Sequence, residues 1–295
     1  MKKLKLELEN SQEEVNKELK SYLPKGKGLE KKLFDAIEYS ILSSGKRLRP
    51  FLVLKTSELF DVDKKRALRV AAAIEMVHCY SLVHDDLPAM DNDNLRRGIP
   101  TTHKKFNEAI AILTGDSLLT LAFQVLSDVL THSDPKIRCE LILELSKAAG
   151  SNGMVGGQMM DLEGQNKNLN IGVITRIQRL KTGALIGFAC NSGAVLGRAE
   201  QKDRFALQGY AHDIGLAFQI KDDLLDIVGK KKNIGKAVKK DEKFGKPTFV
   251  SIMGKERAEK QAEYLSNQAI KHLEIFDDKA DILRDIAKFI VERNK

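Results

Sequence analysis

The 295-residue chain contains three cysteines and no tryptophan, and only 6% of its residues are aromatic. The cysteines are Cys79, Cys139 and Cys190, and they are scattered without paired spacing. This scatter argues against a disulfide framework or a zinc site and is typical of reduced thiols in a cytoplasm. We therefore predict a cytoplasmic protein in which the cysteines are core residues.

Long apolar runs are also missing. The first 20 residues are charged throughout and lack the apolar core of a signal peptide. The most apolar window, residues 109–126, is interrupted by Asp116 and Ser117. We expect neither a signal peptide nor a membrane span.

Strand-like alternation and Pro/Gly/Ser-rich linkers are nearly absent as well. Apolar residues instead recur every three or four positions, as in Leu33-Ile37-Ile41 and Ile174-Ile177-Leu180, which is the spacing of an amphipathic helix. Glycine and proline fall between these runs. The pattern predicts one all-α domain over residues 1–295, with about a dozen helices joined by short loops.

The net charge of +8 is compatible with nucleic acid, an anionic membrane surface or a polyanionic small substrate. The lysine runs at residues 230–232 and 239–240 have no aromatic residues between them. We interpret these runs as solvated faces and predict no nucleic-acid partner.

Two short acidic clusters are the most informative feature of the sequence. Each follows an apolar, helix-like run, residues 77–83 in the first case and 216–220 in the second. Carboxylates in apolar surroundings need compensating positive charge, and hard divalent cations supply it. If the fold brings the clusters together, it builds a site for several metal ions. The six residues are Asp85, Asp86, Asp91, Asp222, Asp223 and Asp226.

Helix geometry supports this interpretation. Asp222 and Asp226 are one turn apart and about 40° apart around a helix axis, so they point to one place. Asp85 and Asp91 would point about 120° apart on an unbroken helix. Pro88 is expected to break that helix between them, because proline lacks an N–H and clashes with the preceding turn. A single pair of aspartates would more often be a solvated helix end, but two such pairs favour a metal site.

Basic residues form two further groups, Lys46-Arg47-Leu48-Arg49 and Arg96-Arg97. Arginine and lysine bind phosphate oxygens directly, so separate acidic and basic clusters indicate substrates with more than one phosphate group. For the second group, the alternative is an ion pair with Asp91 or Asp93. His78 lies about two turns before Asp85 on the same helix, so we place it near the phosphates.

These motifs resemble those of trans-polyprenyl diphosphate synthases. Residues 82–91, followed by 95–98, are similar to the first aspartate-rich motif in its longer bacterial form, and residues 219–226 are similar to the second. Four shorter motifs match in order and spacing, namely residues 45–50, 156–158, 181–183 and 245–248. The resemblance implies an isoprenoid synthase fold, with helices around a central catalytic cavity, and usually a homodimer.

The resemblance also implies a reaction. Isopentenyl diphosphate would condense head to tail with dimethylallyl or geranyl diphosphate to give farnesyl diphosphate, through Mg²⁺-assisted ionisation, alkene attack and proton loss. About three Mg²⁺ ions would bridge the allylic diphosphate. The implied ligands are Asp85, Asp86, Asp91 and Asp222, with Asp223 and Asp226 acting partly through water.

The remaining site residues are carried over from the same motifs. The catalytic residues, which also bind the allylic diphosphate, would be Arg96, Lys181, Thr182, Gln219, Lys236 and Lys246. Isopentenyl diphosphate would be held without metal by Lys46, Arg49, His78 and Arg97.

Tyr80 bears on product length. It lies five residues before Asp85, about 7.5 Å along a helix from the metals, where a growing prenyl chain would run. An aromatic residue there, beside the small Ser81, resembles bacterial farnesyl diphosphate synthases. The alternatives are a geranylgeranyl diphosphate synthase, or a Tyr80 that only packs in the core or a dimer interface.

Three other functions remain open. A terpene cyclase shares the metal chemistry, but it needs no isopentenyl site, and the lack of tryptophan and low aromatic content argue against it because aromatic faces stabilise carbocations. A metal-dependent phosphohydrolase is suggested only by His84-Asp85. A non-catalytic synthase subunit would be expected to lack one acidic motif, and both are intact here.

Overall fold

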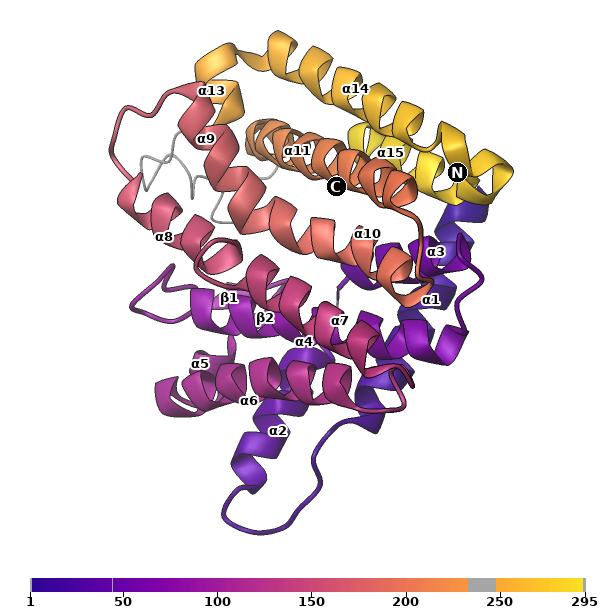
Figure 1. Cartoon of the computed structure of the whole chain (residues 1–295). Helices are drawn as coiled ribbons and strands as arrows, with labels where there is room; N and C mark the ends of the chain where they lie inside the picture. Colours follow the sequence, from indigo (N-terminus) through magenta and orange to yellow (C-terminus); the bar gives the residue numbers. More distant parts are fainter. Residues whose placement is uncertain (1, 44, 233–247, 294–295) are drawn as a thin grey trace.

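The computed structural model describes residues 2–43, 45–232 and 248–293. Almost all of this part of the chain is helical, and the prediction of an all-α fold is confirmed (Figure 1). The helices are α1 (Lys2–Ser21), α2 (Lys31–Ile41), α3 (Leu48–Glu58), α4 (Lys64–Asp85), α5 (Thr102–Lys105), α6 (Glu108–Ser127), α7 (Pro135–Ala149), α8 (Met154–Glu163), α9 (Ile171–Gln178), α10 (Ala184–Leu196), α11 (Gln201–Lys232), α13 (Phe249–Met253), α14 (Lys255–His272) and α15 (Asp281–Glu292). A π-helical turn, η1 (Arg179–Gly183), joins α9 to α10, and a 3₁₀ segment, η2 (Glu274–Ala280), precedes α15.

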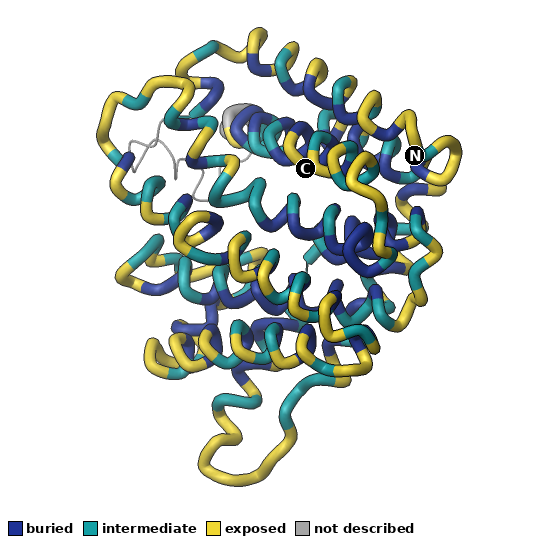
Figure 2. Tube along the Cα trace, viewed as in Figure 1, coloured by how far each residue is buried: buried dark blue, intermediate teal, exposed yellow. Residues whose placement is uncertain are grey.

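Helix α10 is the centre of the packing. It is apolar almost throughout, and it contacts α3, α4, α7 and α11. Helix α14 covers the outer side of α11, and α6 covers α4. In Figure 2 the buried residues follow the sides of these helices that face one another, while exposed residues lie on the outside. Because apolar residues recur at helical spacing, each helix can bury one face in this way.

Helix α4 ends at Asp85, three residues before Pro88, so the predicted break is confirmed. At the other end of α4, the Asp63 side chain caps the helix by accepting hydrogen bonds from the N–H groups of Lys65 and Arg66. After the break, the N–H of Asp91 donates to the carbonyl of Asp85 at 2.9 Å. The acidic segment therefore folds back onto the end of its own helix.

A two-residue antiparallel hairpin follows this turn. Its strands are β1 (Leu95–Arg96) and β2 (Ile99–Pro100), and Leu95 pairs with Pro100. Arg97 at its tip has φ 54° and is followed by Gly98 with φ 83°. Such left-handed positions reverse the chain tightly, so the hairpin turns the two arginines back toward the end of α4.

Among the described residues, α6 is the one helix long and apolar enough to cross a membrane by length and composition. The core helix of a folded protein passes the same test, and α6 packs along α4. Its outer face leaves Ile112 45% and Leu113 52% exposed.

The cysteine prediction is right for two residues and wrong for one. Cys79 and Cys190 are buried free thiols, whereas Cys139 is exposed. The buried residues of α7 are Ile137, Leu141 and others one or two turns further along, so position 139 falls on the solvent side of that helix.

Candidate active site

A cavity of about 640 Å³ opens between the loop that precedes α3 and the helices α4, α10 and α11. Helical elements far apart in the sequence supply its walls. Seven of the residues singled out from the sequence line it, namely Lys46, Arg49, His78, Arg97, Thr182, Gln219 and Asp222. The structure thus brings residues of the predicted isopentenyl group and the second acidic cluster to one hollow.

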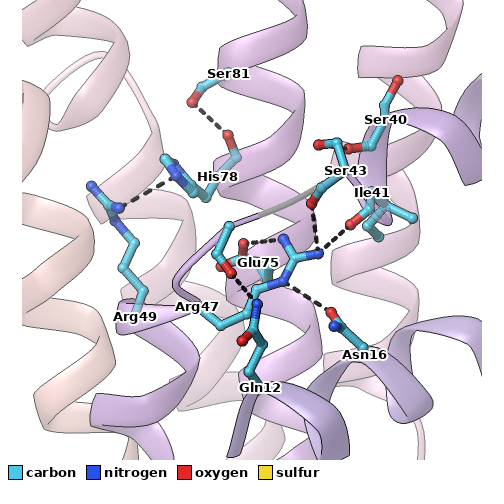
Figure 3. Close-up of polar contacts among 11 residues, drawn as sticks. Gln12, Asn16, Ser40, Ile41, Ser43, Arg47, Arg49, Glu75, His78 and Ser81 are labelled. Carbon is cyan, nitrogen blue, oxygen red and sulfur yellow. Dashed lines mark hydrogen bonds and ion pairs between the residues drawn. The ribbon is translucent and has the colours of Figure 1, made fainter. Parts of the chain in front are cut away.

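One wall of this cavity is basic. Arg49 Nη1 lies 3.5 Å from His78 Nε2 (Figure 3), and because arginine only donates, the imidazole nitrogen is the acceptor. Within the described part of the chain, no carboxylate lies within ion-pair distance of the Arg49 guanidinium, and its buried Nε has no hydrogen-bond partner. A half-buried cation in this state is suited to receive an anion.

The pKa shifts on this wall have the same cause. Burial lowers the pKa of His78 well below its usual range, and the neighbouring Arg49 lowers it further, so His78 is neutral at pH 7. Burial also lowers the pKa of Arg49, and burial together with Arg293 lowers that of Lys46. At Arg49 the effect of burial outweighs that of the carboxylates that act on it, which favours binding of an anion there.

Gly45 allows Arg97 to join this group. A methyl group on Gly45 would lie 2.4 Å from Arg97 Nη1, so only glycine leaves room for the guanidinium at its observed place. The hairpin tip and the loop before α3 therefore meet at the cavity wall.

Asp222, which belongs to the second acidic cluster on α11, also lines this cavity. Asp222 forms an ion pair of 2.6 Å with Arg293, near the end of the chain, and the Arg293 guanidinium stacks on the Phe218 ring at 3.9 Å. Burial raises the pKa of Asp222, and Arg293 offsets only part of that shift. The basic C-terminal end thus reaches the site through Arg293.

The neighbouring acids of α11 lie in different environments. Asp223 is only 6% exposed, and it accepts hydrogen bonds from the N–H of Phe249 at 2.9 Å and from the Gln219 amide at 3.1 Å. Asp226 is exposed. Asp223 therefore fixes the start of α13 and the orientation of Gln219.

In the first acidic cluster, Asp86 is paired with an arginine. Arg96 Nε lies 2.8 and 3.0 Å from the two carboxylate oxygens of Asp86, and Nη2 lies 2.7 Å from one of them. Arg96 also lies 3.9 Å from Asp93, so the alternative expected from the sequence is realised together with the Asp86 pair. Burial raises the pKa of Asp85 to about 6, with Lys181 lowering it in part and Asp91 raising it further.

The π-helical turn η1 links the two acidic clusters. Lys181 acts on Asp85 electrostatically and forms an ion pair of 2.7 Å with Asp161 of α8. The next residue, Thr182, donates a hydrogen bond to Gln219 Oε1 at 3.4 Å. One turn of chain thus faces both aspartate-bearing helices, and π-helical turns are frequent at functional sites.

Gly157 explains why η1 can lie where it does. A methyl group on Gly157 would lie 2.3 Å from the backbone nitrogen of Lys181, far inside any real contact. The glycine-rich stretch at residues 156–158 therefore lets η1 approach closely, and the contact at Gly157 fixes the position of the Lys181 backbone.

The comparisons with known proteins agree with this geometry. The family model of polyprenyl synthetases matches residues 30–286. The chain belongs to this family. It is 45% identical to the farnesyl diphosphate synthase of Escherichia coli (strain K12) over 268 residues, which cover 88% of this chain and 89% of that protein. It is 43% identical to the geranylgeranyl diphosphate synthase of Cyanophora paradoxa, over 89% of this chain and 88% of that one.

A solved structure extends the match to the whole fold. The crystal structure of an FPP/GFPP synthase from Zymomonas mobilis superposes with a TM-score of 0.90 at 46% identity, and it covers 98% of this chain and 99% of that one. The predicted family and the isoprenoid synthase fold are confirmed.

Polyprenyl synthetases are generally Mg²⁺-dependent, and the donor set here fits that metal. Carboxylate oxygens are the ligands that Mg²⁺ prefers, and burial raises the pKa values of Asp85 and Asp222 despite the cationic side chains near them, so a bound cation would stabilise their charged forms. In the described residues, however, no three acidic, histidine or cysteine side chains are gathered closely enough to hold an ion. Arg96 and Arg293 instead neutralise one aspartate in each cluster.

The other residues selected from the sequence are placed as follows. Lys236 and Lys246 lie outside the described residues. Tyr80 is 8% exposed, and its ring packs edge to face on His84 with centroids 5.7 Å apart. Ser81 donates to the carbonyl of His78 at 2.9 Å. This burial suits both a chain-length role for Tyr80 and the packing alternative.

Sequence reasoning missed three residues that form ion pairs in the site. They are Glu75, Asp161 and Arg293, and their partners are Arg47, Lys181 and Asp222. Glu75 forms a buried ion pair of 2.6 Å with Arg47. None of these residues belongs to a motif with an obvious chemical role. The one available signal was the basic C-terminal end of the sequence, which includes Arg293.

Proposed function

We propose that this polyprenyl synthetase condenses isopentenyl diphosphate with dimethylallyl or geranyl diphosphate to give farnesyl diphosphate. The observation that carries the proposal is the 640 Å³ cavity, which is lined both by Arg49, without a carboxylate in ion-pair distance among the described residues, and by Asp222 of the second acidic cluster. The basic residues suit a diphosphate bound directly, and the acidic cluster suits a diphosphate bound through cations. Two diphosphate substrates with different modes of binding fit such a cavity.

The allylic substrate is assigned to the acidic side. About three Mg²⁺ ions, held by Asp85, Asp86, Asp91 and Asp222 and partly through water by Asp223 and Asp226, would supply Lewis-acid stabilisation of the leaving diphosphate. Arg96 and Lys181 would exchange their present partners, Asp86 and Asp161, for phosphate oxygens. We assign the same contact to Lys236 and Lys246.

Loss of the diphosphate leaves an allylic cation. The oxygens of Thr182 and Gln219, which lie 3.4 Å apart, are suited to stabilise it, because preorganised dipoles act strongly where water is excluded. Asp223 holds the Gln219 amide nitrogen and so leaves its oxygen facing Thr182. The alkene of isopentenyl diphosphate attacks the cation, and the departed diphosphate accepts the final proton.

Isopentenyl diphosphate is assigned to Lys46, Arg49, His78 and Arg97. A neutral His78 donates one hydrogen bond at most, so the arginines and Lys46 provide the charge. This group comes from the loop before α3, from α3 itself, from α4 and from the hairpin, and it shares the cavity with Asp222.

A single product assay tests the function. The protein is incubated with Mg²⁺, labelled isopentenyl diphosphate and either dimethylallyl or geranyl diphosphate, and the products are separated by chromatography after removal of the phosphates. We expect a labelled C15 alcohol from both primers. A cyclic hydrocarbon formed from allylic diphosphate alone would identify a terpene cyclase, and free phosphate with an unlabelled alcohol would identify a hydrolase. No metal-dependent binding of an allylic analogue in calorimetry would identify a non-catalytic subunit.

A C20 product is the second candidate. The observation that favours it is the 43% identity to a geranylgeranyl diphosphate synthase, nearly as high as that to the farnesyl enzyme of Escherichia coli. The buried ring of Tyr80 favours C15, because a bulky side chain about 7.5 Å from the metals would close the pocket.

We further propose that residues 1–295 act as one domain in a cytoplasmic homodimer. The outer face of α6 and the turn after it expose large apolar side chains, namely Ile112, Leu113, Val129 and Leu130. Large apolar side chains exposed at both ends of one helix are suited to burial against a second copy. Sedimentation should show a dimer, and Leu113→Glu should weaken it. A monomer at micromolar concentration would refute the homodimer.

A further inference from the structure

The N-terminal helix α1 lies outside residues 30–286, the part of the chain that matches the family model, yet it forms part of the cavity wall. Gln12 of α1 lines the same cavity as Lys46 and Arg49. Its side-chain amide donates to the carbonyl of Gly45 at 2.7 Å. This contact joins α1 to loop residues 45–47, which directly precede α3 and form part of the isopentenyl wall.

A second contact from α1 reaches the same loop (Figure 3). Asn16, one helical turn after Gln12, accepts a hydrogen bond from Arg47 Nε at 3.0 Å. The other donors of Arg47 reach Glu75 at 2.6 Å and the carbonyl of Ile41 at 2.6 Å. The guanidinium is therefore held from three directions, by α1, α4 and the end of α2.

Arg47 needs these tethers because of its backbone. Its φ is 50° and its ψ is 38°, a left-handed conformation that costs a residue with a side chain about 1–2 kcal/mol. Such a conformation persists only where the surroundings over-determine it. Arg47 is turned inward and only 4% exposed, and it lines the cavity together with its neighbours Lys46 and Arg49.

Helix α1 is itself firmly attached. Leu4, Val15 and Leu19 are almost completely buried against the core, and Glu7 forms an ion pair of 2.8 Å with Lys55 of α3. It therefore offers a rigid platform from which Gln12 and Asn16 act.

We propose that Gln12 and Asn16 are positioning residues for the isopentenyl diphosphate subsite, holding loop residues 45–47 so that Lys46 and the following Arg49 meet the diphosphate. This inference rests on the function proposed above, and it makes α1 a part of substrate selection. Neither residue contacts the carboxylates of the allylic half in the described structure, so their removal should affect one substrate only.

The test compares the KM values of the two substrates. Gln12→Leu and Asn16→Leu each keep the size of the side chain and remove its hydrogen bond. We expect each to raise the KM for isopentenyl diphosphate by about three- to tenfold, the loss associated with one partly buried hydrogen bond. The KM for geranyl diphosphate and kcat should stay within about twofold of the wild-type values, since nothing in that half has moved.

Matched variants separate positioning from general stability. Asn16→Asp keeps an acceptor for Arg47 and should retain the wild-type KM for isopentenyl diphosphate. Glu13→Gln, on the exposed side of the same helix, should change neither KM. In a double variant with Lys46→Met, Gln12→Leu should raise the KM for isopentenyl diphosphate by a smaller factor than it does alone. The reason is that Gln12 acts through the loop that carries Lys46.

The outcomes are distinct. Equal rises in both KM values, or an unchanged KM for isopentenyl diphosphate in folded variants, would overturn the inference. If Asn16→Leu lowers Tm strongly, Gln12→Leu decides alone, because Gln12 bonds the carbonyl of Gly45 and not the buried Arg47. If the wild-type protein forms no prenyl product, the proposed function is refuted instead. If it does form product but the variants change the KM values of both substrates equally, only the positioning role is refuted.

Discussion

Two arginines that are two positions apart in the sequence should have opposite effects on stability. Arg47 is 4% exposed and forms a buried ion pair of 2.6 Å with Glu75. Arg49 has no carboxylate within ion-pair distance among the described residues, and burial lowers its pKa. We expect Arg47→Met to destabilise the protein and Arg49→Met to stabilise it.

The sizes of these effects follow from burial and charge. Removing one partner of a buried ion pair typically costs about 3–5 kcal/mol, because the other charge is left uncompensated. With an unfolding entropy of about 0.6 kcal/mol per kelvin for a chain of this length, Arg47→Met should lower Tm by about 5–8 °C. Relief of an uncompensated cation at a binding site is worth about 0.5–2 kcal/mol, so Arg49→Met should raise Tm by about 1–3 °C.

Activity should separate the same two variants. Arg49 would donate charge-assisted hydrogen bonds to the diphosphate, and their loss is worth about 1.5–3 kcal/mol, or about 10- to 150-fold in the KM for isopentenyl diphosphate. Thermal unfolding of the ligand-free protein and steady-state kinetics measure both quantities. A fall in Tm for Arg49→Met like that of Arg47→Met would show that Arg49 is a structural cation, and the anion site would then be wrong.

Three other predictions concern separate parts of the site. Gly157→Ala should lower kcat by about 100-fold, because the added methyl group displaces η1 and Lys181. The control is Gly187→Ala, which should leave kcat unchanged because its added methyl group meets no atom within 4 Å. Similar losses of kcat in both variants would refute the close-approach role of Gly157. Because the pKa of folded His78 lies well below that of the unfolded chain, unfolding takes up a proton as pH falls through 6.5, and stability declines with it. Denaturant titrations should therefore show that wild type loses about 1 kcal/mol more than His78→Gln between pH 7.5 and 5.5, and equal losses would contradict the buried neutral state. Tyr80→Ala should yield products longer than C15 by chromatography, and an unchanged C15 product would leave Tyr80 as a packing residue.

Features set by neighbouring residues could be predicted from the sequence. The helical spacing of apolar residues predicted the all-α fold, and Pro88 predicted the end of α4, because both depend on a few adjacent positions. The order and spacing of the motifs predicted the family. The exposed Cys139 was missed because a cysteine beside apolar residues reads as a core residue unless the exact phase of the helix is known.

Contacts across the fold could not be predicted in this way. The sequence grouped Lys46, Arg47 and Arg49 as one basic cluster, but the left-handed backbone at Arg47 turns that residue into the core. The pair between Asp222 and Arg293 spans 71 positions, and it depends on how α15 packs near α11. Such pairings follow from tertiary geometry, which local patterns do not encode.

The isopentenyl and allylic sides of the site differ in how ready they are for ligand. On the isopentenyl side, Arg49 and a neutral His78 already face the hollow, and the loop that precedes Arg49 is fixed by α1 and α4. On the allylic side, Asp86 and Asp222 are held by Arg96 and Arg293. Cations entering that half must replace these guanidinium groups, and a diphosphate arriving with the cations offers the released arginines new anionic partners. After this exchange the aspartates would be paired with cations and the arginines with phosphate oxygens, so no charge is left without a partner. The arginines that neutralise the ligand-free site thereby become available to hold the leaving group.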